Sequence, residues 1–121
     1  MKNIFGFTLV ELIVVLVLIA IVASIAVPRF INLNTSAKQN STNAIAASLT
    51  TVSASNFAQR TANSSVGSAI SNCTQMSALL SGGLPTGYSI TSLAVSAGAS
   101  VNCTLNGLDS TTATFVAMGI D

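Results

Sequence analysis

The chain has 121 residues, enough for one domain, and half of them are apolar while only 6% are charged, which is unlike an ordinary soluble globular protein. The formal net charge is +1 and no Lys or Arg follows Arg60, so the second half has no basic surface and no nucleic-acid partner is expected. The chain has no His, which excludes a Cys/His zinc site and the usual nucleophile–base pairs. We therefore expect no enzyme activity and no cofactor.

The N-terminal part predicts one membrane-spanning helix over residues 7–28. Nearly every residue between Phe7 and Val27 is apolar, and an α-helix of about 20 residues crosses the hydrocarbon core of a bilayer. Lys2 and the initial amine favour a cytoplasmic N-terminus, although Arg29 at the other end weakens this bias. The rest of the chain is then expected outside the cytoplasm.

Glu11 is the one acidic residue in this apolar segment, and the local sequence supports two interpretations of it. Residues 8–11, TLVE, fit a capping box in which Thr8 is the N-cap and Glu11 bonds back to the first backbone N–H groups. Alternatively, Glu11 is a functional charge inside the membrane, where ionisable groups are costly and normally paired. The spacing alone supports both interpretations equally.

The residues around Glu11 form a more specific pattern. A short leader with Lys2 ends in Gly6, Phe7 follows, Glu11 is the fifth residue after that glycine, and a long aliphatic stretch then leads to Pro28. This pattern resembles the prepilin signature, a class III signal, of type IV pilins and of the pseudopilins of type II secretion. The resemblance covers residues 1 to about 35, and the remainder agrees with the family only in general layout.

The resemblance implies a maturation pathway and a set of partners. A prepilin peptidase would remove the leader, residues 1–6, by cutting between Gly6 and Phe7, and would methylate the new amine of Phe7. In the family, the acid at the position of Glu11 pairs with the N-terminal amine of a neighbouring subunit in a homo-oligomeric helical filament. The subunit would reside in the inner membrane with its head in the periplasm, meet the assembly platform there, and end in an extracellular filament.

Pro28 ends the apolar run, and it is expected either to kink a continuing helix or to lie in a locally melted stretch. Residues 29–62 predict an amphipathic continuation of the helix, because the segment after Phe30 lacks Gly and Pro up to Asn63. Apolar residues recur there at helical steps: Ile45, Leu49, Val52 and Phe57.

Residues 63–121 predict a small globular head, which gives an α+β fold with about three or four antiparallel strands packed on the second half of the helix. A short helix is expected before Gly82, strands at 88–95, 100–105 and 112–118, and a hairpin turn at Asn106-Gly107. The side chains expected to be buried are Ile90, Leu93, Val95, Val101, Leu105, Phe115 and Val116.

Cys73 and Cys103 are the only cysteines, and we expect them to form a disulfide, with two buried free thiols as the alternative. A disulfide requires an oxidising compartment, in agreement with a head outside the cytoplasm. Calcium is the one metal considered, because many major pseudopilins of type II secretion have an acidic calcium loop near the C-terminus. Asp109 and Asp121 are too few ligands for calcium, so no metal is expected.

The function expected from this pattern is a structural subunit of a type IV pilus. The alternative is a minor pilin or pseudopilin of a type II secretion or competence (DNA-uptake) filament. A DNA-binding pilin is disfavoured by the missing cations, and a simple membrane-anchored domain would require that the Gly6–Phe7 bond is never cut.

Overall fold

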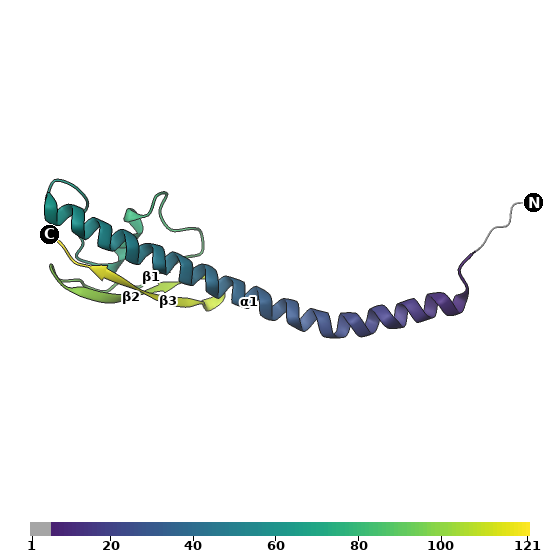
Figure 1. The fold of residues 1–121 in the computed structure, drawn as a ribbon. Coiled ribbons are helices and arrows are strands. Elements are labelled where there is room, and N and C mark those ends of the chain that lie inside the picture. The colour runs from purple at the N-terminus through teal and green to yellow at the C-terminus, as the bar shows by residue number, and fades with distance from the viewer. Residues whose placement is uncertain (1–5) are drawn as a thin grey trace, which may run out of the picture. The chain divides into compact units, whose positions relative to one another are not determined.

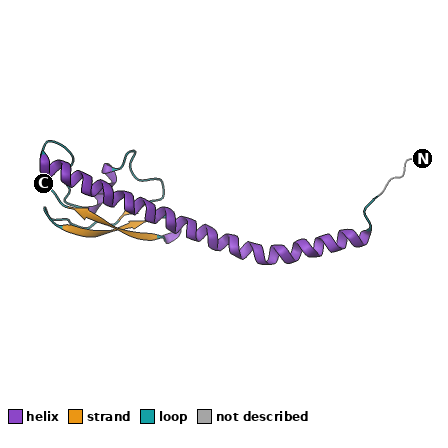
Figure 2. Ribbon diagram, viewed as in Figure 1, coloured by secondary structure: helices purple, strands orange, loops and turns teal. Residues whose placement is uncertain are grey.

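A computed structural model describes residues 6–121, and its α+β class confirms the predicted fold. One long helix, α1 (Leu9–Ala62), precedes two short 3-10 helices, η1 (Cys73–Leu79) and η2 (Leu108–Ser110). The strands are β1 (Ser89–Ile90), β2 (Ser100–Asn106) and β3 (Thr112–Met118), and they form an antiparallel sheet in the order β1-β2-β3. Figure 1 shows these elements along the chain, and Figure 2 shows them by type.

The chain divides into two compact units, with the boundary between Thr35 and Ser36. The first unit, as far as it is described, consists of residues 6–8 and the part of α1 up to residue 35. The second unit contains the remainder of α1 together with both 3-10 helices and all three strands. The sheet packs on α1 within this second unit.

The face of α1 that the second unit buries is narrow and made mostly of small or polar residues. Its buried positions follow one another at steps of four and three residues, so they lie on one side of the helix. Leu49 is the one large apolar side chain among them, whereas the predicted Ile45 and Val52 lie half-buried beside it. The buried positions are Thr42, Ala46, Leu49, Ser53 and Asn56.

The hydroxyl groups of this helix face bond directly to the edge of the sheet. Thr50 Oγ1 accepts a hydrogen bond from the backbone N–H of Val116 at 3.1 Å, and Ser53 Oγ accepts one from Met118 at 2.8 Å. Both N–H groups belong to β3, which is an edge strand, so α1 satisfies donors that a further strand would otherwise take. The small residues of the helix let the sheet approach this closely.

The register of β2 and β3 places alternate side chains in the core. Cys103 pairs with Phe115, and these two residues together with Leu105 are buried under the sheet. The prediction that Val116 is buried beside Phe115 is wrong, because Val116 is only half-buried. The reason is that successive residues of a strand point to opposite faces, so the two cannot share the core face.

The expected strand over residues 88–95 is mostly wrong, because only β1 pairs with β2 there. After Thr91, whose N–H donates to the carbonyl of Thr104 at 3.1 Å, the chain leaves β2 and pairs instead with the segment before η1. Asn72 and Ala94 form an isolated bridge in that pairing. Leu93, which the sequence places in the core, is 46% exposed as a result.

The hairpin between β2 and β3 forms as expected, but its turn is longer than the predicted Asn106-Gly107 pair. Strand pairing ends at Asn106 and Thr112, and η2 lies in the connection. The backbone turns at Asp109 and Ser110, which have positive φ angles of 51° and 60°. Gly107 donates to the carbonyl of Thr111 at 2.7 Å and so extends the ladder by one bond.

The predicted disulfide between Cys73 and Cys103 is confirmed, with a Cα–Cα distance of 5.9 Å. It links η1 to β2 across a core in which both cysteines are fully buried. Val95, Leu105 and Phe115 are buried as predicted, and Ile90 and Val101 are half-buried at the margin of the core. The other buried apolar residues include Ile70, Met76 and Ala117.

Candidate functional site

The candidate site is the start of α1, where the predicted scissile bond and Glu11 lie within six residues of each other. Gly6, Phe7 and Thr8 precede the helix and have no regular secondary structure. Phe7 is 94% exposed, and the first helical hydrogen bond of α1 runs from Leu12 N–H to the carbonyl of Thr8 at 3.2 Å. The Gly6–Phe7 peptide bond therefore lies outside the helix, and cutting it breaks no helical hydrogen bond.

Thr8 and Glu11 form a capping box. The Thr8 N–H donates to Glu11 Oε2 at 2.7 Å, and the Thr8 hydroxyl donates to the same oxygen at 3.1 Å. In return, the Glu11 N–H donates to Thr8 Oγ1 at 3.2 Å. These bonds satisfy N–H groups that a helix start otherwise leaves without partners, and the carboxylate lies at the positive end of the helix dipole.

In the described part of the first unit, residues 6–35, the large apolar side chains are exposed throughout. Each of them leaves about half or more of its surface uncovered, and the most apolar stretch of α1 has no residue buried inside the chain. By length and composition this stretch can cross a membrane. The exposed set runs from Phe7 past the predicted end of the span to Phe30, Ile31 and Leu33.

Pro28 lies inside α1, and the helix continues on both sides of it. Because proline has no N–H, the carbonyl of Ser24 lacks its usual helical donor. The Ser24 hydroxyl itself donates to the carbonyl of Ile21 at 2.7 Å, which keeps this polar side chain satisfied on the helix. A kink at Pro28 remains a prediction.

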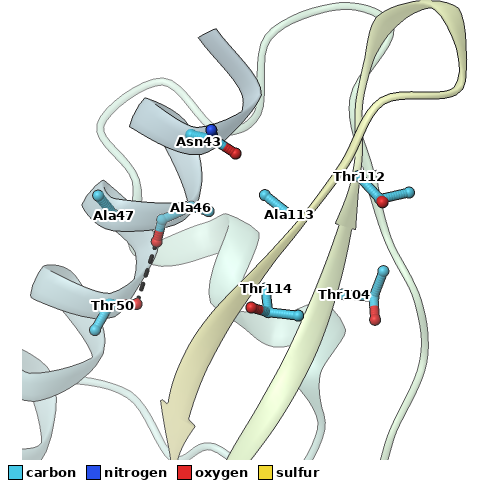
Figure 3. A pocket seen from close by; sticks show the side chains of 8 residues that line it. All are labelled: Asn43, Ala46, Ala47, Thr50, Thr104, Thr112, Ala113 and Thr114. Carbon is cyan, nitrogen blue, oxygen red and sulfur yellow. Dashed lines mark hydrogen bonds between the residues drawn. The ribbon is translucent and has the colours of Figure 1, made fainter. Parts of the chain in front are cut away.

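One cavity of the second unit is lined by small, uncharged side chains. A cavity of about 600 Å³ lies between α1 and the strands, lined only by Asn, Ala and Thr side chains (Figure 3). Asn43 and Thr50 come from the helix, and Thr114 from β3. Within residues 6–121 no group of three or more His, Cys, Asp or Glu residues is placed to hold a metal ion.

Two cationic side chains of α1 bind residues that follow the helix in the second unit. Lys38 forms an ion pair with Asp109 in the β2–β3 connection. Arg60 donates to the carbonyl of Asp121 through Nε and to the carbonyl of Ser64 at 2.9 Å through Nη1. Each cation of residues 36–121 thus has a partner inside the unit, and the two lie at separate places on the helix.

The structure describes most of the residues to which the sequence assigns a role. Phe7 and Glu11 lie at the same helix start, and Cys73 and Cys103 are bonded to each other. Lys2 and the rest of the leader before Gly6 lie outside the described residues. The sequence indicates Thr8 as the N-cap but gives no sign that both its N–H and its hydroxyl bind one oxygen of Glu11.

Comparison with known proteins supports the resemblance over the N-terminal part. Residues 1–27 match the family model of the prokaryotic N-terminal methylation motif. The chain is 50% identical over 44 residues to the type IV narrow pilus major component PilA5 of Thermus thermophilus. These residues are 36% of this chain and 38% of that protein. No solved structure matches the chain.

These matches confirm the predicted class III signal and a distant similarity to type IV pilins. The aligned part spans less than half of the relative's length, and the motif ends at residue 27 of this chain. Both matches agree with the expectation of a structural protein and not an enzyme.

Proposed function

We propose that this chain, which carries the N-terminal methylation motif and is similar to a type IV pilus component, is a structural subunit of a type IV pilus filament. It would assemble through the first part of α1 after removal of its leader. The second unit would remain as a small head on the filament surface.

The observation that carries this proposal is the uncovered apolar surface of α1 from Leu9 to Leu33. Exposing such a surface to water is unfavourable, because burying one large aliphatic side chain contributes about 1.5–3 kcal/mol. A membrane would cover the stretch up to Val27 before assembly. In a filament, the apolar helices of neighbouring copies would cover it instead, so the subunit can leave the bilayer without exposing the helix to water.

Maturation is the first proposed step. A prepilin peptidase would cut the leader, residues 1–6, at the Gly6–Phe7 bond, and the new amine of Phe7 would be methylated. The exposed, non-helical geometry of residues 6–8 supports this step, because the peptidase would not need to unwind α1.

Docking is the second proposed step, in which Glu11 pairs with the amine of Phe7 of a neighbouring copy. A buried ion pair contributes little net stability, whereas an unpaired buried charge is strongly unfavourable. Only an axial stagger that brings both groups together satisfies them. Glu11 would therefore fix the register between neighbouring helices, whose apolar surfaces alone permit many staggers.

The proposed partners and locations follow from these steps. The unassembled subunit would span the inner membrane through residues 7–28, with the head in the periplasm, and would meet the assembly platform there. The disulfide between Cys73 and Cys103 supports a periplasmic and then extracellular head, because such bonds persist in oxidising compartments.

The test is the yield of sheared surface filaments from cells that express the Glu11→Ala variant. We expect filaments to be lost or strongly reduced while the protein remains in the membrane fraction. Ser24→Ala is the matched control, because it removes another polar side chain from the same apolar helix without removing a charge. Undiminished filaments from Glu11→Ala would contradict the docking step.

The alternative proposal is a minor pilin or a pseudopilin of a type II secretion or competence filament. The N-terminal features on which the proposal rests occur in these subunits as well, and the aligned relative is covered over only 38% of its length. Immunogold labelling separates the two: a major subunit lies along the whole filament, whereas a minor subunit is sparse or confined to one end.

A further inference from the structure

The two hydrogen bonds that Thr8 donates to Glu11 end on the same carboxylate oxygen, Oε2. The other oxygen, Oε1, has no hydrogen-bond partner within residues 6–121. A carboxylate can accept hydrogen bonds at both oxygens, so the capped side chain keeps half of its acceptor capacity free. The cap and an external partner therefore do not compete for the same atom.

We propose that Thr8 is a positioning residue that presents Oε1 of Glu11 to the amine of a neighbouring copy. This inference rests on the proposed docking step and adds a requirement to it. A free Glu side chain samples many rotamers, and ordering it opposes binding. Thr8 fixes the carboxylate before the neighbouring copy arrives. The Glu11 side chain therefore loses less conformational entropy when the two copies dock.

The same geometry disfavours pairing between Glu11 and the amine of its own chain. After cleavage that amine is the nitrogen of Phe7, only four residues away, and an intramolecular partner is always present at high effective concentration. In the structure the helix starts at Leu9, Thr8 is the cap, and Phe7 lies outside it. Oε2 of Glu11 is already bonded to the backbone N–H of Thr8, which is one residue closer to Glu11 along the chain than the amine of Phe7 is.

Without the Thr8 hydroxyl, two of the three bonds that define this cap disappear. These are the bond from the hydroxyl to Oε2 and the bond from the Glu11 N–H to Oγ1. The side chain of Glu11 is then freer to turn toward its own amine. Loss of a threonine N-cap lowers the equilibrium constant for helix formation about fivefold. We expect a shift of similar size in the equilibrium between the capped Glu11 side chain and one paired with its own amine.

Two variants of the full-length chain isolate this role. Thr8→Val keeps the size and branching of the side chain and removes the hydroxyl, whereas Thr8→Ser keeps the hydroxyl and removes the methyl group. Glu11→Ala, measured beside them, reports on the docking step itself. The mass of the mature chain shows for each variant whether cleavage at Gly6–Phe7 still occurs, and all comparisons use the cleaved fraction.

Filament yield is the first measurement. We expect Thr8→Val to lower the yield of sheared filaments about fivefold, and Thr8→Ser to keep it close to that of the natural chain. If Thr8→Val assembles normally while Glu11→Ala does not, the positioning role is wrong and the docking step stands. If Glu11→Ala itself assembles normally, the docking step is wrong.

Carbodiimide coupling is the second measurement, and it reports on self-pairing. In detergent-solubilised mature monomers, the reagent activates the Glu11 carboxylate, and attack by the chain's own amine forms an amide with net loss of one water. Trypsin releases residues 7–29 as one peptide, so the mass of that peptide shows the reaction. We expect about five times more of this product in Thr8→Val than in the natural chain or Thr8→Ser. Equal amounts in all three proteins would overturn the proposal.

Discussion

Breaking the disulfide between Cys73 and Cys103 should destabilise the second unit while leaving its fold recognisable. The bond closes a loop with a sequence separation of 30 residues. Loop-closure entropy for such a loop gives about 3.5 kcal/mol, and a change of this size moves the thermal midpoint of a domain of this length by roughly 15–25 °C. Both cysteines are fully buried, so a reductant should act mainly after unfolding.

The assay is thermal unfolding of the full-length protein in detergent, followed by the fluorescence of Tyr88. Tyr88 is the only tyrosine, the chain has no tryptophan, and its side chain packs at the margin of the core. The double variant Cys73→Ala, Cys103→Ala is compared with the natural chain, each with and without reductant. Reductant should leave the variant unchanged. A midpoint within a few degrees of the natural chain would refute the loop-entropy argument.

Three further substitutions test the packing of the second unit by the same assay. Leu49→Ala should cost about 2–5 kcal/mol, because Leu49 is the large fully buried apolar side chain of the helix face; a cost below about 1 kcal/mol would contradict that placement. Ser53→Ala should cost about 1–3 kcal/mol by leaving the Met118 N–H without its acceptor, and no change would mean that water replaces the hydroxyl. Lys38→Ala should cost no more than about 1 kcal/mol, because its partner Asp109 is largely exposed; a larger loss would mean that the pair organises the β2–β3 connection.

The N-terminal features can be predicted from the sequence because their chemistry is local. Thr8 and Glu11 are three residues apart, and a helical turn brings them together without help from the rest of the fold. The apolar run needs no tertiary partner to be recognised either, since its length alone matches a bilayer. The cysteines are the only possible pair, so their bond can be predicted although 30 residues separate them.

The buried face of α1 can be predicted only in part. A search for apolar periodicity finds Leu49, but it passes over Thr42, Ser53 and Asn56, which are polar and nevertheless buried. Their burial is tolerated because each has a partner: Asn56, for example, donates to the carbonyl of Ser68 at 2.9 Å and accepts from its N–H at 2.8 Å. These partners lie outside the helix, and the spacing of apolar residues within the helix gives no information about them.

The sheet shows the same limit. The predicted ranges of β2 and β3 are close to the observed ones, because polar and apolar residues alternate along β2 and because β3 is rich in Thr, Val and Phe, which favour strands. The segment after Ile90 has similar residues, yet Ala94 pairs with Asn72 and not with β2. Strand propensity indicates that a segment is extended, whereas its pairing partner is decided by tertiary packing.

The mass of the N-terminal tryptic peptide from sheared surface filaments tests the central claim most directly. If the chain is a processed filament subunit, this peptide begins at Phe7, ends at Arg29 and carries one methyl group on its amine. The same preparation should contain the chain as a repeating component of the filament. A chain that still begins before Gly6, or that is absent from the filaments while abundant in the membrane, would contradict the account.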